Sequence, residues 1–183
     1  MRTAARRAAV LIGTAARSDL LNSDPCYDAT LAREFNSLTP ESDLKWDRIH
    51  PAPDVYNFTP ADRLVAFAQQ HRMAVKGHNL IWSQQSLDST PDWVNAINDR
   101  TALRAALADH IKTVVSRYKG RVDRWDVVNE PLETYGSDLY KNHFYQVLGS
   151  GYIAHVHWQS RGSNFRRARS RTSAWCRPAC TPA

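Results

Sequence analysis

One glutamate in this sequence has the surroundings of a catalytic proton donor. Glu130 ends the run Val122–Glu130, which is built on three valines and a tryptophan, and it directly precedes Pro131. We predict a strand for this run. A carboxyl at the end of a buried strand can act as a general acid and base, because burial favours its protonated form. The alternative is a surface carboxylate in the turn before Pro131, and the preceding strand favours the catalytic interpretation.

Two side chains of an earlier apolar run, residues 73–82, could bind a sugar. His78 and Trp82 are separated by an even number of residues, so in one continuous strand they lie on the same side. The indole of Trp82 offers an apolar face on which a sugar ring can stack, while His78, Asn79 and Gln85 offer hydrogen bonds to hydroxyls. A core tryptophan beside a satisfied core histidine explains these residues equally well when they are taken alone.

A third candidate pair, Glu41 and Lys45, lies in the run LTPESDLKWD (residues 38–47). Both side chains could bind sugar hydroxyls from the wall of a cleft. Locally, a surface ion pair at i and i+4 of a helix is the favoured interpretation.

The elements that must position these residues alternate between strand and helix patterns. Thr59 is predicted to cap a helix with Pro60 in its first turn. A second helix is predicted from Asp99 to Gly120, and its apolar side chains fall on one stripe. The predicted strands are Val10–Thr14, Ser37–Leu38 running toward Glu41, Val75–Trp82 and Val122–Glu130. A further helical region, residues 138–158, is interrupted at residues 149–151.

This alternation predicts an α/β fold with a parallel sheet and crossover helices. Parallel sheets carry their chemistry at the carboxyl ends of the strands. The candidate residues collect at that edge: Glu41 and Lys45, His78 and Trp82, Asn129 and Glu130.

Charge is distributed unevenly along the 183 residues. The chain carries 24 Lys and Arg against 18 Asp and Glu, a formal charge of +6, and the whole surplus lies in Ser160–Ala183. Residues 1–159 are formally neutral, which argues against nucleic-acid or anionic-membrane binding by the body. No run approaches the roughly 18 apolar residues of a membrane span. Three cysteines without histidine or cysteine neighbours at zinc spacing predict neither a disulfide framework nor a metal site.

The first 16 residues superficially resemble a secretory signal, because three arginines precede an apolar stretch. The apolar part, Ala8–Ile12, is shorter than the roughly 7 to 15 residues that such a signal needs. We therefore favour an Arg- and Ala-rich helix that leads into the first strand, and the sequence leaves secretion undetermined.

The last 24 residues, Ser160–Ala183, have no apolar periodicity and no acidic residue. One hypothesis is a disordered basic tail. The other is translation out of frame beyond about His157, which resequencing of the coding DNA would test. On either hypothesis, residues 1–159 form one region and residues 160–183 another.

Three blocks of the body together resemble the endo-1,4-β-xylanases of glycoside hydrolase family 10. The blocks are EFNSLTPESDLKWD (Glu34–Asp47), GHNLIWSQQ (Gly77–Gln85) and WDVVNEP (Trp125–Pro131). They occur in the family's order, and the resemblance extends over about Ala8 to Trp158. Three ordered blocks are far more specific than any one of them.

The resemblance implies a (β/α)8 barrel of the TIM type that cleaves xylan internally with retention, needs no cofactor and is secreted. Glu130 would be the general acid/base, and Asn129 would contact the 2-hydroxyl of the sugar. Ser42 stands where the family usually has asparagine and Ser83 where it frequently has histidine, so the sugar contacts at these two positions are expected to differ from the family's. The remaining substrate-binding residues implied are Glu41, Lys45, His78, Trp82 and Gln85.

One element of the family's pattern is absent from this sequence. A retaining glycosidase needs a second carboxylate about 5 to 5.5 Å from the first, as nucleophile, and the family carries it in a Thr-Glu-Leu-Asp type motif. The last acidic residue here is Asp138, and Glu133 is too close to Glu130 along the chain to face it across a barrel. A complete barrel takes about 250 residues, so we expect only about its first four β/α units here, within residues 1–159.

A partial barrel predicts particular solution properties and low activity, and two other functions are also considered. Unpaired strand edges predict self-association or poor solubility, and the missing nucleophile predicts little or no turnover. A second interpretation is a carbohydrate-binding fragment without catalysis. A third, nucleic-acid binding through the arginines of the tail, is disfavoured by the neutral body.

Overall fold

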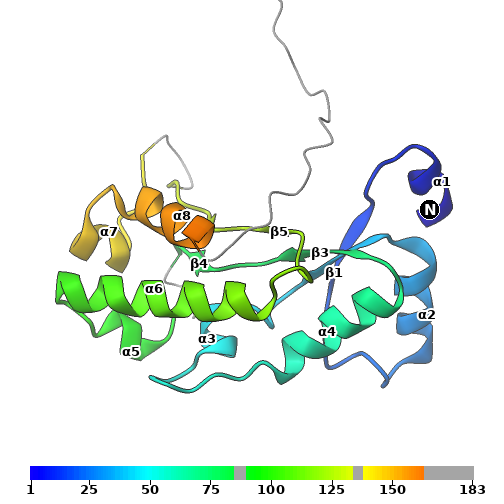
Figure 1. Cartoon of the computed structure of the whole chain (residues 1–183), viewed down its shortest axis with the longest axis horizontal. Coiled ribbons are helices and arrows are strands. Elements are labelled where there is room, and N and C mark those ends of the chain that lie inside the picture. Colours follow the sequence, from blue (N-terminus) through cyan, green and yellow to red (C-terminus); the bar gives the residue numbers. More distant parts are fainter. Residues whose placement is uncertain (85–89, 134–137, 163–183) are drawn as a thin grey trace, which may run out of the picture.

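A parallel β-sheet forms the centre of the computed structural model, which describes residues 1–84, 90–133 and 138–162. Its strand order is β1-β2-β3-β5, and a two-stranded sheet β4-β6 continues beyond it. Every pairing is parallel (Figure 1). The strands are β1 (Gly13–Ala16), β2 (Ser37–Pro40), β3 (Ala74–Gly77), β4 (Ile81–Trp82), β5 (Arg124–Trp125) and β6 (Val128–Asn129).

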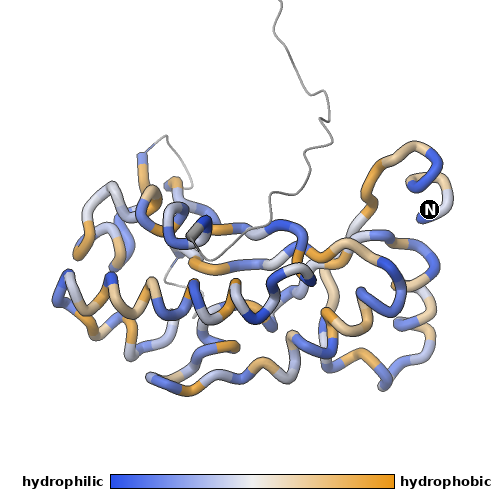
Figure 2. Tube along the Cα trace, viewed as in Figure 1, coloured by the Kyte–Doolittle hydropathy of each residue, from blue (hydrophilic) through white to orange (hydrophobic). Residues whose placement is uncertain are grey.

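Helices connect these strands, and Figure 1 shows α2, α4 and α6 along one side of them. The described helices are α1 (Arg2–Arg7), α2 (Pro25–Glu34), α3 (Trp46–Ile49), α4 (Thr59–Gln70), α5 (Asp92–Asn95), α6 (Arg100–Arg117), α7 (His143–Leu148) and α8 (Tyr152–Gly162). In Figure 2 apolar positions recur along these helices and the strands, and the buried apolar side chains form one core cluster. None of the described helices is long and apolar enough to cross a membrane.

The prediction for α6 is confirmed. The Asp99 carboxylate accepts a hydrogen bond from the backbone N–H of Ala102, and Gly120 follows the helix with a φ of +76°. The stripe predicted for its inner face is buried: Leu103, Leu107, Ile111, Val114, Val115 and Tyr118. Local pattern and local capping determine this helix.

Two element boundaries differ from the sequence prediction. Strand β1 begins at Gly13 and not at Val10; the Asn36 side chain bonds the backbone before it, accepting from Ile12 N–H and donating to the Val10 carbonyl. Thr59 was predicted to cap α4, but it is the first helical residue, and the cap is Phe58 without a side-chain hydrogen bond. The Phe58 ring instead packs in a T-shaped contact against Tyr118, 6.1 Å between centroids.

Each of the two long strands predicted around the candidate site is divided in two. The third predicted strand is interrupted over residues 78–80, and the fourth over residues 126–127. Backbone bonds join the two interruptions: Asp126 N–H donates to the Gly77 carbonyl, and Leu80 N–H donates to the Asp126 carbonyl. The interruptions therefore lie side by side, and the strands resume in register as β4 and β6, with Trp82 opposite Asn129.

Candidate active site

Trp82 lies at the centre of the candidate site. Its Nε1–H donates a 2.9 Å hydrogen bond to Glu130 Oε2, and the Lys45 ammonium lies 4.5 Å from the centroid of its ring. The His78 ring meets it at 60°, 6.3 Å between centroids. Side chains from three predicted blocks therefore converge on one indole.

The structure brings His78 and Trp82 together for a different reason from the one expected. The even-spacing argument assumed one continuous strand, and the interruption at residues 78–80 removes that assumption. The two rings meet because β4 resumes beside β6, which orients Trp82 toward Glu130.

Glu130 occupies an unusual backbone conformation between Asn129 and Pro131. Its φ is +48°, in the left-handed region that costs a residue with a side chain on the order of 1–3 kcal/mol. Such conformations concentrate at functional sites, where the surrounding structure holds them. The side chain is exposed, so the burial expected from the sequence is wrong for the described part of the chain. The hydrogen bond from Trp82 Nε1–H, and not burial, holds the Glu130 carboxylate in position.

Asp126 forms a charged group with Lys76 and His78 that the sequence did not predict. Asp126 Oδ2 lies 2.9 Å from His78 Nδ1 and 2.7 Å from Lys76 Nζ. Partial burial alone would raise the pKa of Asp126, but the hydrogen bonds and charges of Lys76 and His78 outweigh it and lower the pKa below its ordinary value. Asp126 therefore stays ionised and orients the imidazole through its Nδ1 atom.

The signal for this group was present in the sequence. Lys76 lies between Val75 and Gly77, and Asp126 lies between Trp125 and Val127; charges that are partly buried among apolar neighbours are expected to be paired. The pairing itself requires the parallel alignment of β3 and β5, which places Lys76 opposite Arg124.

The other predicted sugar-binding residues fall in three places. Glu41 follows β2 and is exposed, and the segment from Glu41 to Lys45 is not helical, so the surface helical pair favoured locally is wrong. The Asn129 backbone carbonyl accepts a hydrogen bond from Ser83 N–H. Gln85 lies outside the described residues, as does the basic tail from residue 163 onward.

Ser83, one of the two departures from the family's pattern, faces the core. It is fully buried, and its hydroxyl lies 3.0 Å from the Tyr152 hydroxyl. Asn142 Nδ2 donates to the Ser83 carbonyl and to the Tyr152 hydroxyl, while its Oδ1 caps α7. This buried network ties the end of β4 to α7 and α8. Ser83 therefore has a structural partner in place of a sugar contact.

Comparison with known proteins agrees with this geometry. Residues 1–169 match the sequence profile described as glycosyl hydrolase family 10. A β-1,4-xylanase of Dictyoglomus thermophilum is 45% identical over 128 residues, 69% of this chain and 35% of the relative. Endo-1,4-β-xylanase B of Thermotoga neapolitana is 39% identical over 156 residues, 84% of this chain and 44% of the relative.

Solved structures show the same relation in three dimensions. Xylanase 10B of Thermotoga petrophila, crystallised with xylobiose, superimposes with a TM-score of 0.81 at 40% identity over 89% of this chain and 49% of its own. Native xylanase 10B of Thermotoga maritima gives the same TM-score and identity. The chain thus spans about half or less of the proteins that it matches, and the parallel α/β fold expected from the TIM-barrel resemblance is confirmed over that span. With 169 of its residues within the family profile, the chain belongs to glycosyl hydrolase family 10.

Proposed function

We propose that this chain carries the proton-donating, sugar-binding part of an endo-1,4-β-xylanase site. The observation that carries the proposal is the 2.9 Å hydrogen bond from Trp82 to Glu130, made beneath the Lys45 ammonium. It joins the acid/base of the family's reaction to an aromatic surface suited to a sugar ring. Relatives of this family have been crystallised with xylobiose and xylotriose.

In the proposed reaction Glu130 protonates the oxygen of the leaving sugar and later activates water, so that the anomeric configuration is retained. The Trp82 indole fixes Oε2, and Oε1 has no hydrogen-bond partner among the described residues. Lys45 and His78 would donate hydrogen bonds to hydroxyls of the sugar bound beside the reacting bond. The nucleophile of a retaining reaction is not assigned to any residue of this sequence.

The proposal is tested by affinity electrophoresis of the chain in gels that contain soluble birchwood xylan. We expect xylan to retard the chain, and Trp82→Ala to lower the affinity at least about 5-fold, because loss of one stacking partner removes roughly 1–3 kcal/mol. Trp93→Phe provides an aromatic control away from the site, since Trp93 packs against Trp46 and His50. Equal mobility of the chain in gels with and without xylan would contradict the proposal.

Non-catalytic carbohydrate binding is the second candidate function. One observation favours it: the described site contains only one carboxylate assigned to catalysis, Glu130, beside several groups suited to binding. Glu130→Gln separates the two. It should leave xylan retardation within about 3-fold of the unmodified chain, because the amide still accepts the Trp82 hydrogen bond. A catalytic role predicts in addition that this substitution lowers any turnover that a complementing half of the barrel restores.

A further inference from the structure

We propose that a pocket between helices α6 and α8 binds a small oxyanion, a phosphate or a carboxylate. The pocket has a volume of about 260 Å³, below the roughly 300–1,000 Å³ of pockets that hold drug-sized ligands. Its described lining contains no residue of the candidate active site, so the inference goes beyond the proposed function and does not depend on it. The lining residues used below are Arg100, Arg104, Gly149, Ser150, Gly151 and His155.

Two helices bring nitrogen donors to this pocket. Arg100 and Arg104 lie one turn apart on α6, and His155 lies on α8. Helix α8 packs beside α6 (Figure 1), so both helices supply the wall. Arg100 Nη2 donates a 2.8 Å hydrogen bond to the Leu148 carbonyl, which fixes that guanidinium at the pocket. None of the described lining residues is acidic, so the two guanidinium groups give the pocket a net positive charge.

Arg104 and His155 have donor capacity that no other part of the described chain uses. Arg104 makes no ion pair or hydrogen bond with the described residues, and His155 Nε2 is buried without a hydrogen-bond partner among them. A buried nitrogen without a partner costs free energy that a bound oxyanion would recover. Burial lowers the pKa of His155, and the nearby charge of Arg104 lowers it further. An anion between the two side chains would offset that repulsion as well.

The loop before α8 adds backbone donors at the same place. Residues 149–151 are Gly-Ser-Gly, and α8 begins at Tyr152 without an acidic residue in its first turn. The first N–H groups of a helix have no acceptor inside it and carry the positive end of its dipole. A Cβ added at Gly149 or Gly151 would meet nothing within 4 Å. The space beside both glycines is therefore open to a ligand.

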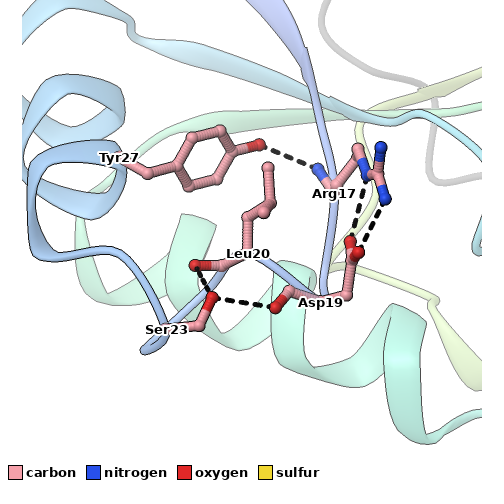
Figure 3. Close-up of polar contacts among 5 residues, drawn as sticks. All are labelled: Arg17, Asp19, Leu20, Ser23 and Tyr27. Carbon is pink, nitrogen blue, oxygen red and sulfur yellow. Dashed lines mark hydrogen bonds and ion pairs between the residues drawn. The ribbon is translucent and has the colours of Figure 1, made fainter.

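Arg17 shows how an exposed arginine is neutralised elsewhere in this chain (Figure 3). Its guanidinium binds Asp19 through two hydrogen bonds, Nε to Oδ1 at 3.1 Å and Nη2 to Oδ2 at 2.7 Å. At the pocket, the acid next to Arg100 is Asp99, and its carboxylate accepts from Ala102 N–H as the cap of α6. The pocket arginines therefore retain charge that an external anion can use.

Calorimetric titration of the whole chain at pH 7 tests the site. The ligands are sodium phosphate and sodium glucuronate, with ionic strength held constant by sodium chloride, and glucose is the neutral analogue of glucuronate. We expect one bound anion per chain and no binding of glucose. Tighter binding of phosphate identifies a phosphate group as the ligand, and tighter binding of glucuronate identifies a sugar acid.

Two variants locate the anion. Arg104→Ala removes a charged donor, and Gly151→Asp places a fixed carboxylate in the open space; each should weaken binding at least about 10-fold, because hydrogen bonds to charged groups are the stronger class. Gly151→Asn has nearly the shape of the aspartate without its charge and should bind within about 3-fold of the unmodified chain. Arg17→Ala is the matched control for the loss of one positive charge and should change binding by less than about 2-fold.

Three results would overturn the site. They are the failure of both anions to bind, binding that stays within about 2-fold in either Arg104→Ala or Gly151→Asp, and an equal loss in Arg17→Ala, which would indicate attraction by net charge alone. Arg104 and Gly151 are exposed, so every variant should keep the circular dichroism of the unmodified chain. A loss of binding with that spectrum unchanged is then not a loss of folding.

Discussion

Gly77 lies directly beneath the indole of Trp125, one residue before His78. A Cβ added at Gly77 would come 2.2 Å from Trp125 Cε3, and the two residues are register partners in β3 and β5. Neither β3 nor β5 can move away from the other without breaking the strand pairing that positions the site. We expect Gly77→Ala to lower the free energy of unfolding by about 1–3 kcal/mol, measured by urea denaturation.

Gly151 supplies the matched control for that substitution. A Cβ at Gly151 meets nothing within 4 Å, so Gly151→Ala should change the free energy of unfolding by less than about 0.5 kcal/mol. Equal effects of the two substitutions would show that the Trp125 contact is not what excludes a side chain at Gly77.

Asp126 couples the stability of the site to pH. Its pKa is lowered in the folded chain, so its ion pairs contribute stability above the unfolded pKa of about 3.9, and that contribution is lost as pH falls through the folded pKa. Asp126→Asn should therefore unfold at lower urea concentration than the unmodified chain at pH 7. The difference should shrink below about pH 4. Asp138→Asn, at an exposed position, should show no such pH-dependent difference.

At the scale of elements, a buried histidine pair links α3 to α6. His50 follows α3 and His110 lies on α6, with their Nδ1 atoms 3.4 Å apart. Burial lowers the pKa of both imidazoles, and the neighbouring His50 lowers that of His110 further. The charges of Asp109 and Asp54 oppose the effect at His50 without reversing it. The pair is therefore neutral in the folded chain, and the Trp46 ring stacks 4.0 Å from His110.

This pair predicts a loss of stability in weak acid. The unfolded imidazoles take up protons below about pH 6.5 and the folded ones resist, so stability is full above that pH and falls below it by up to about 1.4 kcal/mol per pH unit and histidine. Urea denaturation at pH 7.5, 6.5 and 5.5 measures the slope, and His110→Gln should reduce it by roughly half. Exposed His157→Gln is the control. A flat profile in the unmodified chain between pH 7.5 and 5.5 would rule out the neutral pair.

The elements also show how far the sequence could predict this fold. Helix α6 was predictable because its cap and apolar stripe are local features. The divided strands were not, because the breaks at residues 78–80 and 126–127 are held by backbone bonds between segments about 48 positions apart. The meeting of Trp82 with Glu130 followed from parallel-sheet geometry and the family blocks. The Asp126 group did not, since its three members join only after β3 and β5 align.

At the scale of the whole molecule, the sheet ends in strands that have one neighbour each among the described residues. Strands β1 and β5 form the edges of the larger sheet, and β6 pairs only with β4. The exposed side chain of Leu132 lies just beyond β6. Open edges with apolar side chains favour pairing with a second chain, so we expect this 183-residue polypeptide to self-associate at micromolar concentration in sedimentation velocity. Leu132→Lys should weaken the association more than Val55→Lys, which changes an equally exposed residue between α3 and α4. A stable monomer of the unmodified chain would contradict this expectation.

Turnover depends on a second catalytic carboxylate that is not assigned in this sequence. A retaining reaction needs two carboxylates about 5 to 5.5 Å apart, and no acidic residue follows Asp138 in this sequence. We expect the polypeptide alone to bind xylan without releasing measurable reducing sugar. The match covers 49% of the solved xylanase 10B of Thermotoga petrophila and leaves about the other half of that protein unmatched. Added as a separate polypeptide, that half should pair with the open edges and restore some turnover, which Glu130→Gln should then lower by about 100-fold or more. Reducing-sugar release by the chain alone at a rate typical of glycosidases would show that a residue within these 183 acts as the second carboxylate.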